Sequence, residues 1–167
     1  TQDLFLFSDT ITDNINYGNH DASIPFIREM AAIADANNFI DQMPDGYDTV
    51  VGERGVGLSG GQKQRISLTR ALVKDPRILI LDDTTSALDM ETEATIQQRL
   101  KAITKNKTVF IIASRISSLR HADHIIVLRH GEIIEQGNHE SLLAQNGYYA
   151  ETYRRQLGLI KDAKGDE

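Results

Sequence analysis

Residues 78–83 read Ile-Leu-Ile-Leu-Asp-Asp, a short apolar run that ends in two acids, and this stretch decides the fold class. A continuous apolar run of this kind is typical of a strand buried on both faces of a parallel sheet. A second run at Thr108–Ala113 predicts another such strand, and apolar residues at helical spacing in Glu91–Ile103 predict the crossover helix between them. Strands that alternate with helices indicate an α/β fold.

Asp82 and Asp83 directly follow the first predicted strand. An acid at the carboxyl end of a parallel strand lies at the edge where α/β sheets bind ligands. In P-loop NTPases such an acid holds Mg²⁺. Asp also favours strand ends and turns, so these two residues alone leave a plain turn and a metal site both open.

Upstream, residues 58–62 read Leu-Ser-Gly-Gly-Gln. Ser59 followed three residues later by Gln62 is a capping box, which predicts that a helix begins here and continues through Val73. Gly60 and Gly61 leave the backbone N–H groups at the helix start unobstructed, and the helix dipole favours an anion there, usually a phosphate. A capping box in isolation is more often a plain helix start, but the acids about 20 residues further on favour the phosphate site.

The rest of the chain divides into a mostly helical part before Val73 and an α/β part after it. A helix is expected within Pro25–Asn37, and Pro44–Gly46 predicts a turn. Two strands flank His130–Gly131 as a hairpin. The elements expected after position 124 are strands at Ile125–Leu128 and Glu132–Glu135, a helix His139–Ala144 capped by Asn138 and ended by Gly147, a last helix Tyr148–Leu157, and a polar tail.

Composition excludes several classes of protein. The apolar runs are far shorter than the roughly 18 residues of a membrane span, and Thr1–Ser8 lacks the features of a signal peptide. There is no Cys, which excludes disulfides and thiolate metal sites, and the net charge of −6 argues against a nucleic-acid surface. Because the chain opens without Met, we expect it to be an excerpt from a longer polypeptide.

These motifs, in this order, resemble those of an ABC-transporter nucleotide-binding domain from its Q-loop onward. The resemblance runs from residue 1 to about residue 157. The matching segments are Gln2 with Asp3–Phe5 (Q-loop), Thr49–Gly55 (the X-loop of exporters), Leu58–Gln62 (signature), Ile78–Asp83 (Walker B), Ser86–Asp89 (D-loop), and Gly131–Ile133 with Glu135–Glu140 (C-terminal segment).

The resemblance implies a RecA-like, P-loop NTPase core with a parallel sheet, incomplete on its N-terminal side, joined to an ABC helical subdomain. The limits that follow are 1–9 for the Q-loop segment, 10–73 for the helical subdomain with X-loop and signature, 74–157 for the core with Walker B, D-loop and switch position, and 158–167 for the tail.

It also implies ATP and Mg²⁺ as ligands and assigns roles by position. Gln2 would reach Mg²⁺ and the attacking water, and Asp82 would support Mg²⁺. The residues expected to contact ATP held by the opposite subunit, or to act across the dimer interface, are Ser59, Gly60, Gly61, Gln62 and Asp89. The Gln2 and Glu53 regions would face the transmembrane domain.

Three departures from the family pattern matter. No Gly-x-x-x-x-Gly-Lys-Ser/Thr occurs. Asp83 stands where the catalytic Glu is expected, and its carboxylate is retracted by about 1.5 Å, whereas a misplacement of about 1 Å can cost on the order of 10²-fold in rate. Ser114 replaces the switch histidine and lacks the reach and charge of an imidazole. Together Asp83 and Ser114 predict an ATP site that binds but turns over slowly.

The intact signature beside a weakened site predicts one half of a heterodimeric exporter, a transport-coupled ATPase at the cytoplasmic face of the cell membrane. Its partner would be a second, non-identical nucleotide-binding domain, with no nucleic acid. Two alternatives stay open. One is a soluble ABC ATPase of the chromosome or DNA-repair type, which Thr49–Gly55 and the charge of −6 disfavour. The other is an inert dimerisation module, which the missing phosphate loop favours for this chain alone.

Overall fold

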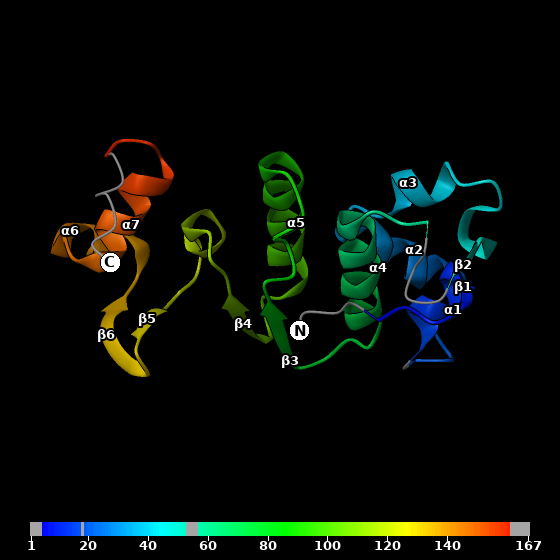
Figure 1. Cartoon of the computed structure of the whole chain (residues 1–167). Helices are drawn as coiled ribbons and strands as arrows, with labels where there is room; N and C mark the ends of the chain where they lie inside the picture. Colours follow the sequence, from blue (N-terminus) through cyan, green and yellow to red (C-terminus); the bar gives the residue numbers. More distant parts are fainter. Residues whose placement is uncertain (1–4, 18, 53–56, 161–167) are drawn as a thin grey trace. The chain divides into compact units, whose positions relative to one another are not determined.

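The computed structural model describes residues 5–17, 19–52 and 57–160. It forms two compact units, Thr1–Ile112 and Ala113–Glu167. Figure 1 gives the elements in chain order: β1 (Asp9–Thr10), α1 (Ile11–Asn16), α2 (Ile24–Ile33), α3 (Asn37–Asp41), η1 (Gly46–Asp48), β2 (Val50–Val51), α4 (Gly60–Val73), β3 (Ile78–Asp82), α5 (Met90–Ile103), β4 (Thr108–Ile112), η3 (Ile116–Leu119), β5 (Ile125–Arg129), β6 (Glu132–Gly137), α6 (His139–Gln145) and α7 (Tyr148–Gln156).

The strand–helix–strand unit predicted around residues 78–83 is confirmed. β3 pairs in parallel with β4, from Ile78 opposite Thr108 to Asp82 opposite Ile112, and α5 is the helix between them. Asp89 caps α5 by accepting a hydrogen bond from the Thr92 N–H at 2.9 Å. This parallel pair and its crossover helix make the first unit an α/β structure (Figure 1).

The prediction that both strands are buried on both faces is wrong for the part of the chain that the structure describes. Leu79 and Leu81 are buried, whereas Ile78 and Ile80 are 60% and 63% exposed. The reason is that α5 and the helical part contact one face of β3, so only alternate side chains are covered. The periodicity of the sequence could not show this, because the whole run is apolar.

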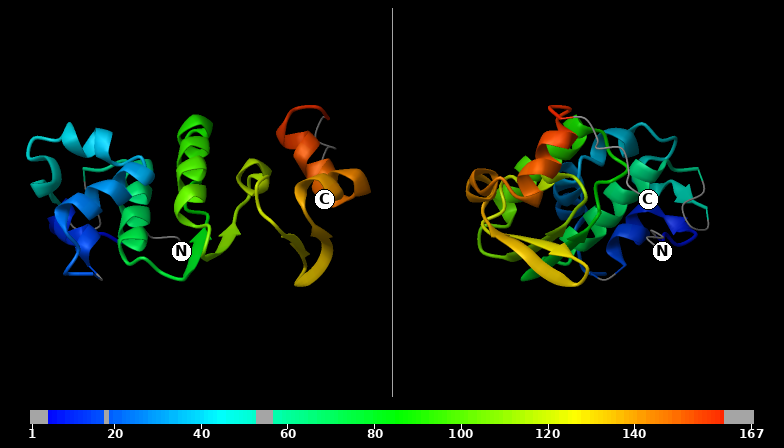
Figure 2. Two further views of the ribbon diagram at one scale, coloured as in Figure 1. Left: turned by 180° about the vertical axis from the view of Figure 1, so that it is seen from behind. Right: turned by 60° about the vertical axis from the view of Figure 1, so that its left-hand side comes forward.

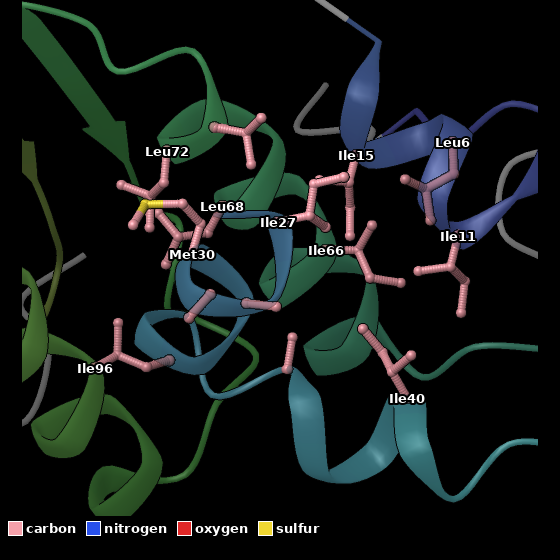
Figure 3. Close-up of a cluster of buried hydrophobic side chains, with 14 of the residues drawn as sticks. Leu6, Ile11, Ile15, Ile27, Met30, Ile40, Ile66, Leu68, Leu72 and Ile96 are labelled. Atoms are coloured by element: carbon pink, nitrogen blue, oxygen red, sulfur yellow. The ribbon is translucent and has the colours of Figure 1, made fainter. Parts of the chain in front are cut away.

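The core of the first unit joins the helical part to the strands. Its buried side chains come from all five helices α1 to α5, from η1, β2 and β3, and from connecting segments. Figure 3 shows some of those from the helices meeting one another: Ile11, Ile15, Ile27, Met30, Ile40, Ile66, Leu68, Leu72 and Ile96. α4 contacts both α1 and α2. Contacts between apolar side chains therefore hold α4 against α1 and α2 in the first unit.

The helix predicted within Pro25–Asn37 is shorter than expected. α2 ends at Ile33, and Asp35 adopts a left-handed backbone with φ 55° before α3 begins. Two arginines hold Asp35 there: Arg65 of α4 at 3.2 Å and Arg99 of α5 at 2.9 Å. Because these partners are distant in sequence, the local pattern gave no sign of the break.

The second unit contains the predicted hairpin. β5 and β6 pair antiparallel with an irregularity at Val127/Leu128, and α6 contacts both β6 and α7. Figure 2 shows this unit from two further sides. Asn138 caps α6 as predicted, through the Ser141 N–H at 2.9 Å. The helix ends at the left-handed Asn146 and not at Gly147, which instead precedes α7.

Candidate functional site

The capping box predicted at the start of α4 is present. The Ser59 hydroxyl accepts a hydrogen bond from the Gln62 N–H at 3.2 Å, and the Ser59 N–H donates to Oε1 of Gln62 at 2.9 Å. The first helical hydrogen bond runs from the Lys63 N–H to the Ser59 carbonyl at 3.0 Å. The Ser59 hydroxyl keeps its own proton for a further acceptor.

Three backbone N–H groups, those of Gly60, Gly61 and Gln62, precede the first helical hydrogen bond of α4, and the Ser59 hydroxyl accepts from that of Gln62. Helix geometry leaves such groups without an intrahelical partner, and the helix dipole adds partial positive charge around them. Ser59 and Gly60 are exposed. This helix end therefore fits a phosphate group, which takes hydrogen bonds from N–H and hydroxyl donors.

The two glycines differ in what surrounds them. A Cβ at Gly60 would lie 3.6 Å from Cβ of Ala87, an ordinary contact, whereas one at Gly61 would lie 3.0 Å from Cδ2 of Leu88 and 3.2 Å from the Ala87 carbonyl. Gly61 is thus required by the packing of α4 on the loop before α5. The sequence motif suggested only that glycine leaves room for a ligand.

Asp82 and Asp83 lie at the carboxyl end of β3. Asp82 is exposed at the last position of the strand. Asp83 has a left-handed backbone with φ 48°, and its N–H donates to the Ile112 carbonyl at 2.8 Å. The left-handed region is uncommon for residues other than Gly, and Asp is among the few residue types that are enriched in it. Asp83 therefore has a conformational reason to be Asp, which the sequence did not show.

The connecting loop, Asp83–Leu88, leads from β3 to Asp89. It is held from α5 by buried Glu93, which accepts from the Thr85 hydroxyl at 2.9 Å. It is held from α4 by Gln64, which bonds to two consecutive loop residues. Sequence reasoning did not single out Gln64 or Glu93. The sequence did contain a signal for Gln64. It lies at helical spacing between Gly61 and Leu68, so it is a polar residue on the face of the helix that was expected to pack.

Asp89 is exposed and uses both carboxylate oxygens on the first turn of α5. One accepts from the Thr92 N–H at 2.9 Å, and the other accepts from the Thr92 hydroxyl at 2.8 Å. The backbone hydrogen bond, followed by the hydroxyl, lowers the pKa of the Asp89 carboxyl. Asp89 is therefore ionised at neutral pH and fixed in direction.

Ser114 belongs to the second unit, whereas Ser59, Asp82, Asp83 and Asp89 belong to the first. It is exposed, and its carbonyl accepts from the Gln156 side chain at 2.8 Å. The signature residues, the connecting loop and the end of β3 thus all belong to the first unit. The switch position, Ser114, belongs to the second unit.

Two predicted residues lie outside the described part of the chain. These are Gln2 and Glu53. Residues 53–55, the second half of the predicted X-loop Thr49–Gly55, also lie outside the described part. The described half contains β2, which pairs antiparallel with β1.

Over residues 5–17, 19–52 and 57–160, no group of three or more His, Asp or Glu side chains could hold a metal ion. Asp82 by itself still fits Mg²⁺, which commonly takes one or two carboxylates and completes its shell with water and phosphate oxygens. Over the same ranges, no helix is long and apolar enough to cross a membrane.

Comparison with known proteins identifies the family of this chain. The family model described as "ABC transporter" matches residues 1–86, just over half of the 167 residues. The chain belongs to the ABC transporter family.

Three similar proteins illustrate the relation. The chain is 56% identical over 160 residues to an uncharacterized ABC transporter ATP-binding protein, YknU, of Bacillus subtilis, covering 96% of the chain and 27% of that protein. It is 53% identical over 163 residues to the ATP-dependent lipid A-core flippase of Legionella pneumophila, covering 97% and 28%. A solved bacterial Atm1-family ABC exporter with ATP bound superimposes with a TM-score of 0.88 at 45% identity, covering 98% of the chain and 28% of that exporter.

The chain thus spans little more than a quarter of the length of these relatives. The high TM-score confirms the predicted fold class, a RecA-like α/β core with the ABC helical subdomain. The predicted limits 1–9, 10–73, 74–157 and 158–167 stay a prediction.

Proposed function

We propose that this chain is part of the ATP-binding and ATP-hydrolysing domain of an ABC exporter, and that it couples ATP binding and hydrolysis to export across a membrane. The observation that carries the proposal is the exposed start of α4, where Ser59, Gly60 and Gly61 present a hydroxyl and two N–H groups beside the loop that leads to Asp89. The similarity to the Legionella flippase and to the Atm1-family exporter supports export over the function of a soluble chromosome or DNA-repair ATPase.

In this function the start of α4 completes the site of a second nucleotide-binding domain. The Ser59 hydroxyl and the N–H groups of Gly60 and Gly61 donate to the γ-phosphate of ATP held by that domain, while Gln62 fixes Ser59 through the capping box. Asp89 acts across the same interface as a fixed carboxylate. Hydrolysis of the bond between the β- and γ-phosphates of ATP, with transfer of the γ-phosphoryl group to water, drives transport.

Within its own site, Asp82 would support Mg²⁺, and Asp83 would stand at the position of the family's catalytic Glu. The shorter reach of Asp83 and the missing imidazole at Ser114 make this site slow. The proposed second domain is therefore non-identical, with the faster site. Contact with the transmembrane domain falls to the Gln2 and Glu53 regions, which places the chain at the cytoplasmic face of the cell membrane.

The test uses the reconstituted full-length exporter pair with Mg-ATP hydrolysis as the readout. Gly60→Asp places a negative charge at the phosphate-binding helix end, and we expect activity to fall at least about tenfold, equivalent to about 1.4 kcal/mol of transition-state stabilisation. Asp83 belongs to the slow site, so we expect Asp83→Asn to reduce the ATPase activity much less than Gly60→Asp does.

Gly60→Asn is the matched control, because it has the same shape without the charge. The Cβ that both variants add would meet only Cβ of Ala87 at 3.6 Å, so neither should disturb the chain itself. Equal losses of activity in Gly60→Asn and Gly60→Asp would indicate a steric effect and would contradict the proposed anion site. A larger loss from Asp83→Asn than from Gly60→Asp would place the faster site on this chain and reverse the proposed asymmetry.

A further inference from the structure

The connecting loop is a compact turn built around the carbonyl of Asp83. That carbonyl accepts from the Ser86 N–H at 3.3 Å and from the Ser86 hydroxyl at 3.0 Å. The Leu88 N–H donates to the Thr85 carbonyl at 3.0 Å. Because Asp83 has a left-handed backbone, the direction of its side chain depends on this turn keeping its shape.

Gln64 of α4 is the polar side chain that joins this turn to the helix. It is 8% exposed, and its amide uses both ends: Nε2 donates to the Ser86 hydroxyl at 3.1 Å, and Oε1 accepts from the Ala87 N–H at 3.1 Å. The Ala87 N–H can only donate, so the oxygen of the amide must face it. The two bonds therefore fix the rotation of the amide as well as its position.

Gln64 also lies beside the residues that start α4. Gly61 is three residues earlier, on the same side of the helix, and its Cα faces Leu88 and the Ala87 carbonyl so closely that a Cβ would be crowded. The loop consequently rests on the first turn of α4 through Gly61 and is tied to the second turn through Gln64. A shift of α4 would move the loop with it.

We propose that Gln64 is a positioning residue, which fixes the loop carrying Asp83 and leading to Asp89 relative to the Ser59–Gly61 end of α4. The chain of contacts runs from Gln64 to the Ser86 hydroxyl and from there to the Asp83 carbonyl. It connects the groups that serve the partner domain's ATP with the strand end that serves this chain's own ATP. The inference rests on the proposed function only for its rate measurement.

The rate test uses the full-length exporter pair. Gln64→Leu removes both hydrogen bonds at nearly constant side-chain size. We expect kcat for Mg-ATP to fall about tenfold while KM changes less than about threefold, because a misplaced catalytic geometry costs rate and not ground-state binding. The matched control is Gln98→Leu, on the exposed face of α5, which should leave kcat and the melting temperature unchanged.

A double-mutant cycle with Ser86 separates positioning from plain stability. Ser86→Ala breaks the middle contact, whereas Ser86→Thr keeps a hydroxyl and should retain most of the activity. If Gln64 acts through Ser86, the Gln64→Leu/Ser86→Ala double variant loses little more than the worse single variant. Losses that multiply, or a lower melting temperature with unchanged kcat, overturn the proposal. If Gln64→Leu does not fold, the contrast between Ser86→Ala and Ser86→Thr decides in the same way.

A second readout does not need ATP hydrolysis. Amide hydrogen exchange in the full-length protein should be faster at Ala87 in Gln64→Leu than in the wild type, and unchanged in Gln98→Leu, because Gln64 is the acceptor for that N–H. Unchanged exchange at Ala87 overturns the inference. A wild-type exporter without ATPase activity would instead overturn the proposed function, and the exchange result would still decide the role of Gln64.

Discussion

At the scale of single residues, the proposed function makes the short carboxylate of Asp83 one reason why this chain's own site is slow. Asp83 has φ 48°, a conformation in which Asp is more common than longer side chains. The short side chain of Asp83 is therefore compatible with the left-handed backbone at this position. A longer carboxylate at this position would gain reach and lose part of that backbone preference.

We predict that Asp83→Glu combined with Ser114→His raises ATP turnover at this chain's own site about tenfold. The gain falls short of the roughly hundredfold effect of a 1 Å correction, because Glu is less suited to the left-handed backbone. The measurement is Mg-ATP hydrolysis by the full-length pair with the partner's hydrolytic site disabled. An unchanged rate in a double variant that still binds ATP would remove the explanation based on Asp83 and Ser114.

At the scale of elements, Asp35 connects three helices of the first unit. Its carboxylate accepts from Arg65 of α4 at 3.2 Å and from Arg99 of α5 at 2.9 Å, while its backbone ends α2 with φ 55°. The side chain is 21% exposed, so the charges are partly shielded from water. One residue thus fixes both a helix end and the direction of α4 relative to α5.

We predict that Asp35→Ala lowers the free energy of unfolding by about 2 kcal/mol, since charge-assisted hydrogen bonds are lost and Ala disfavours a left-handed backbone. Asp35→Asn should cost about half as much, because Asn tolerates this conformation and keeps an oxygen acceptor. Urea unfolding of the chain gives both values. Equal losses for Ala and Asn would show that only the charge matters.

In the second unit, His139 at the start of α6 packs against Tyr149 and Tyr153 of α7. Its Nδ1 lies 2.8 Å from the Tyr149 hydroxyl, and the His139 and Tyr153 rings meet edge to face. Burial lowers the pKa of His139, and the positive charges of Arg120 and His121 add to this while Glu140 opposes it. The folded unit therefore favours the neutral imidazole.

The pH dependence follows from that direction. The unfolded chain binds a proton at His139 near pH 6.5, whereas the folded unit binds it only at lower pH, so stability is complete above about pH 6.5 and falls below it. We predict that the second unit is less stable at pH 5.5 than at pH 7.5, and that His139→Gln reduces this difference. Tyrosine fluorescence during urea unfolding reports it, since three of the five tyrosines are Tyr148, Tyr149 and Tyr153. An identical pH dependence in the variant would contradict the assignment to His139.

At the scale of the whole molecule, the proposed function assigns groups of this chain to two different ATP molecules and gives it a complete site for neither. In that proposal the start of α4 donates to a phosphate held by the second domain, and Asp82 and Asp83 need a phosphate loop that the 167 residues do not contain. Backbone N–H groups and the Lys of such a loop supply most of the contacts to the β- and γ-phosphates.

We predict that the 167-residue chain alone binds Mg-ATP with a Kd above about 1 mM, equivalent to less than about 4 kcal/mol of binding free energy. Isothermal titration calorimetry measures this directly, with the full-length pair as the positive control. Tight, stoichiometric binding by the chain alone would show that a complete site is present after all.

Local patterns in the sequence were sufficient for the features that local forces create. The capping box at Ser59 and Gln62 spans three residues, and the apolar runs of β3 and β4 predicted parallel strands with a crossover helix, because short-range hydrogen bonds and hydrophobic spacing determine these elements. Contacts between residues far apart in sequence were decided only by the tertiary structure. Gln64 meets Ser86 across 22 positions and Asp35 meets Arg99 across 64, and which face of β3 is covered depends on the helices packed against it. A polar residue on a helix indicates that it needs a partner, but only the packing of distant elements determines which partner it finds.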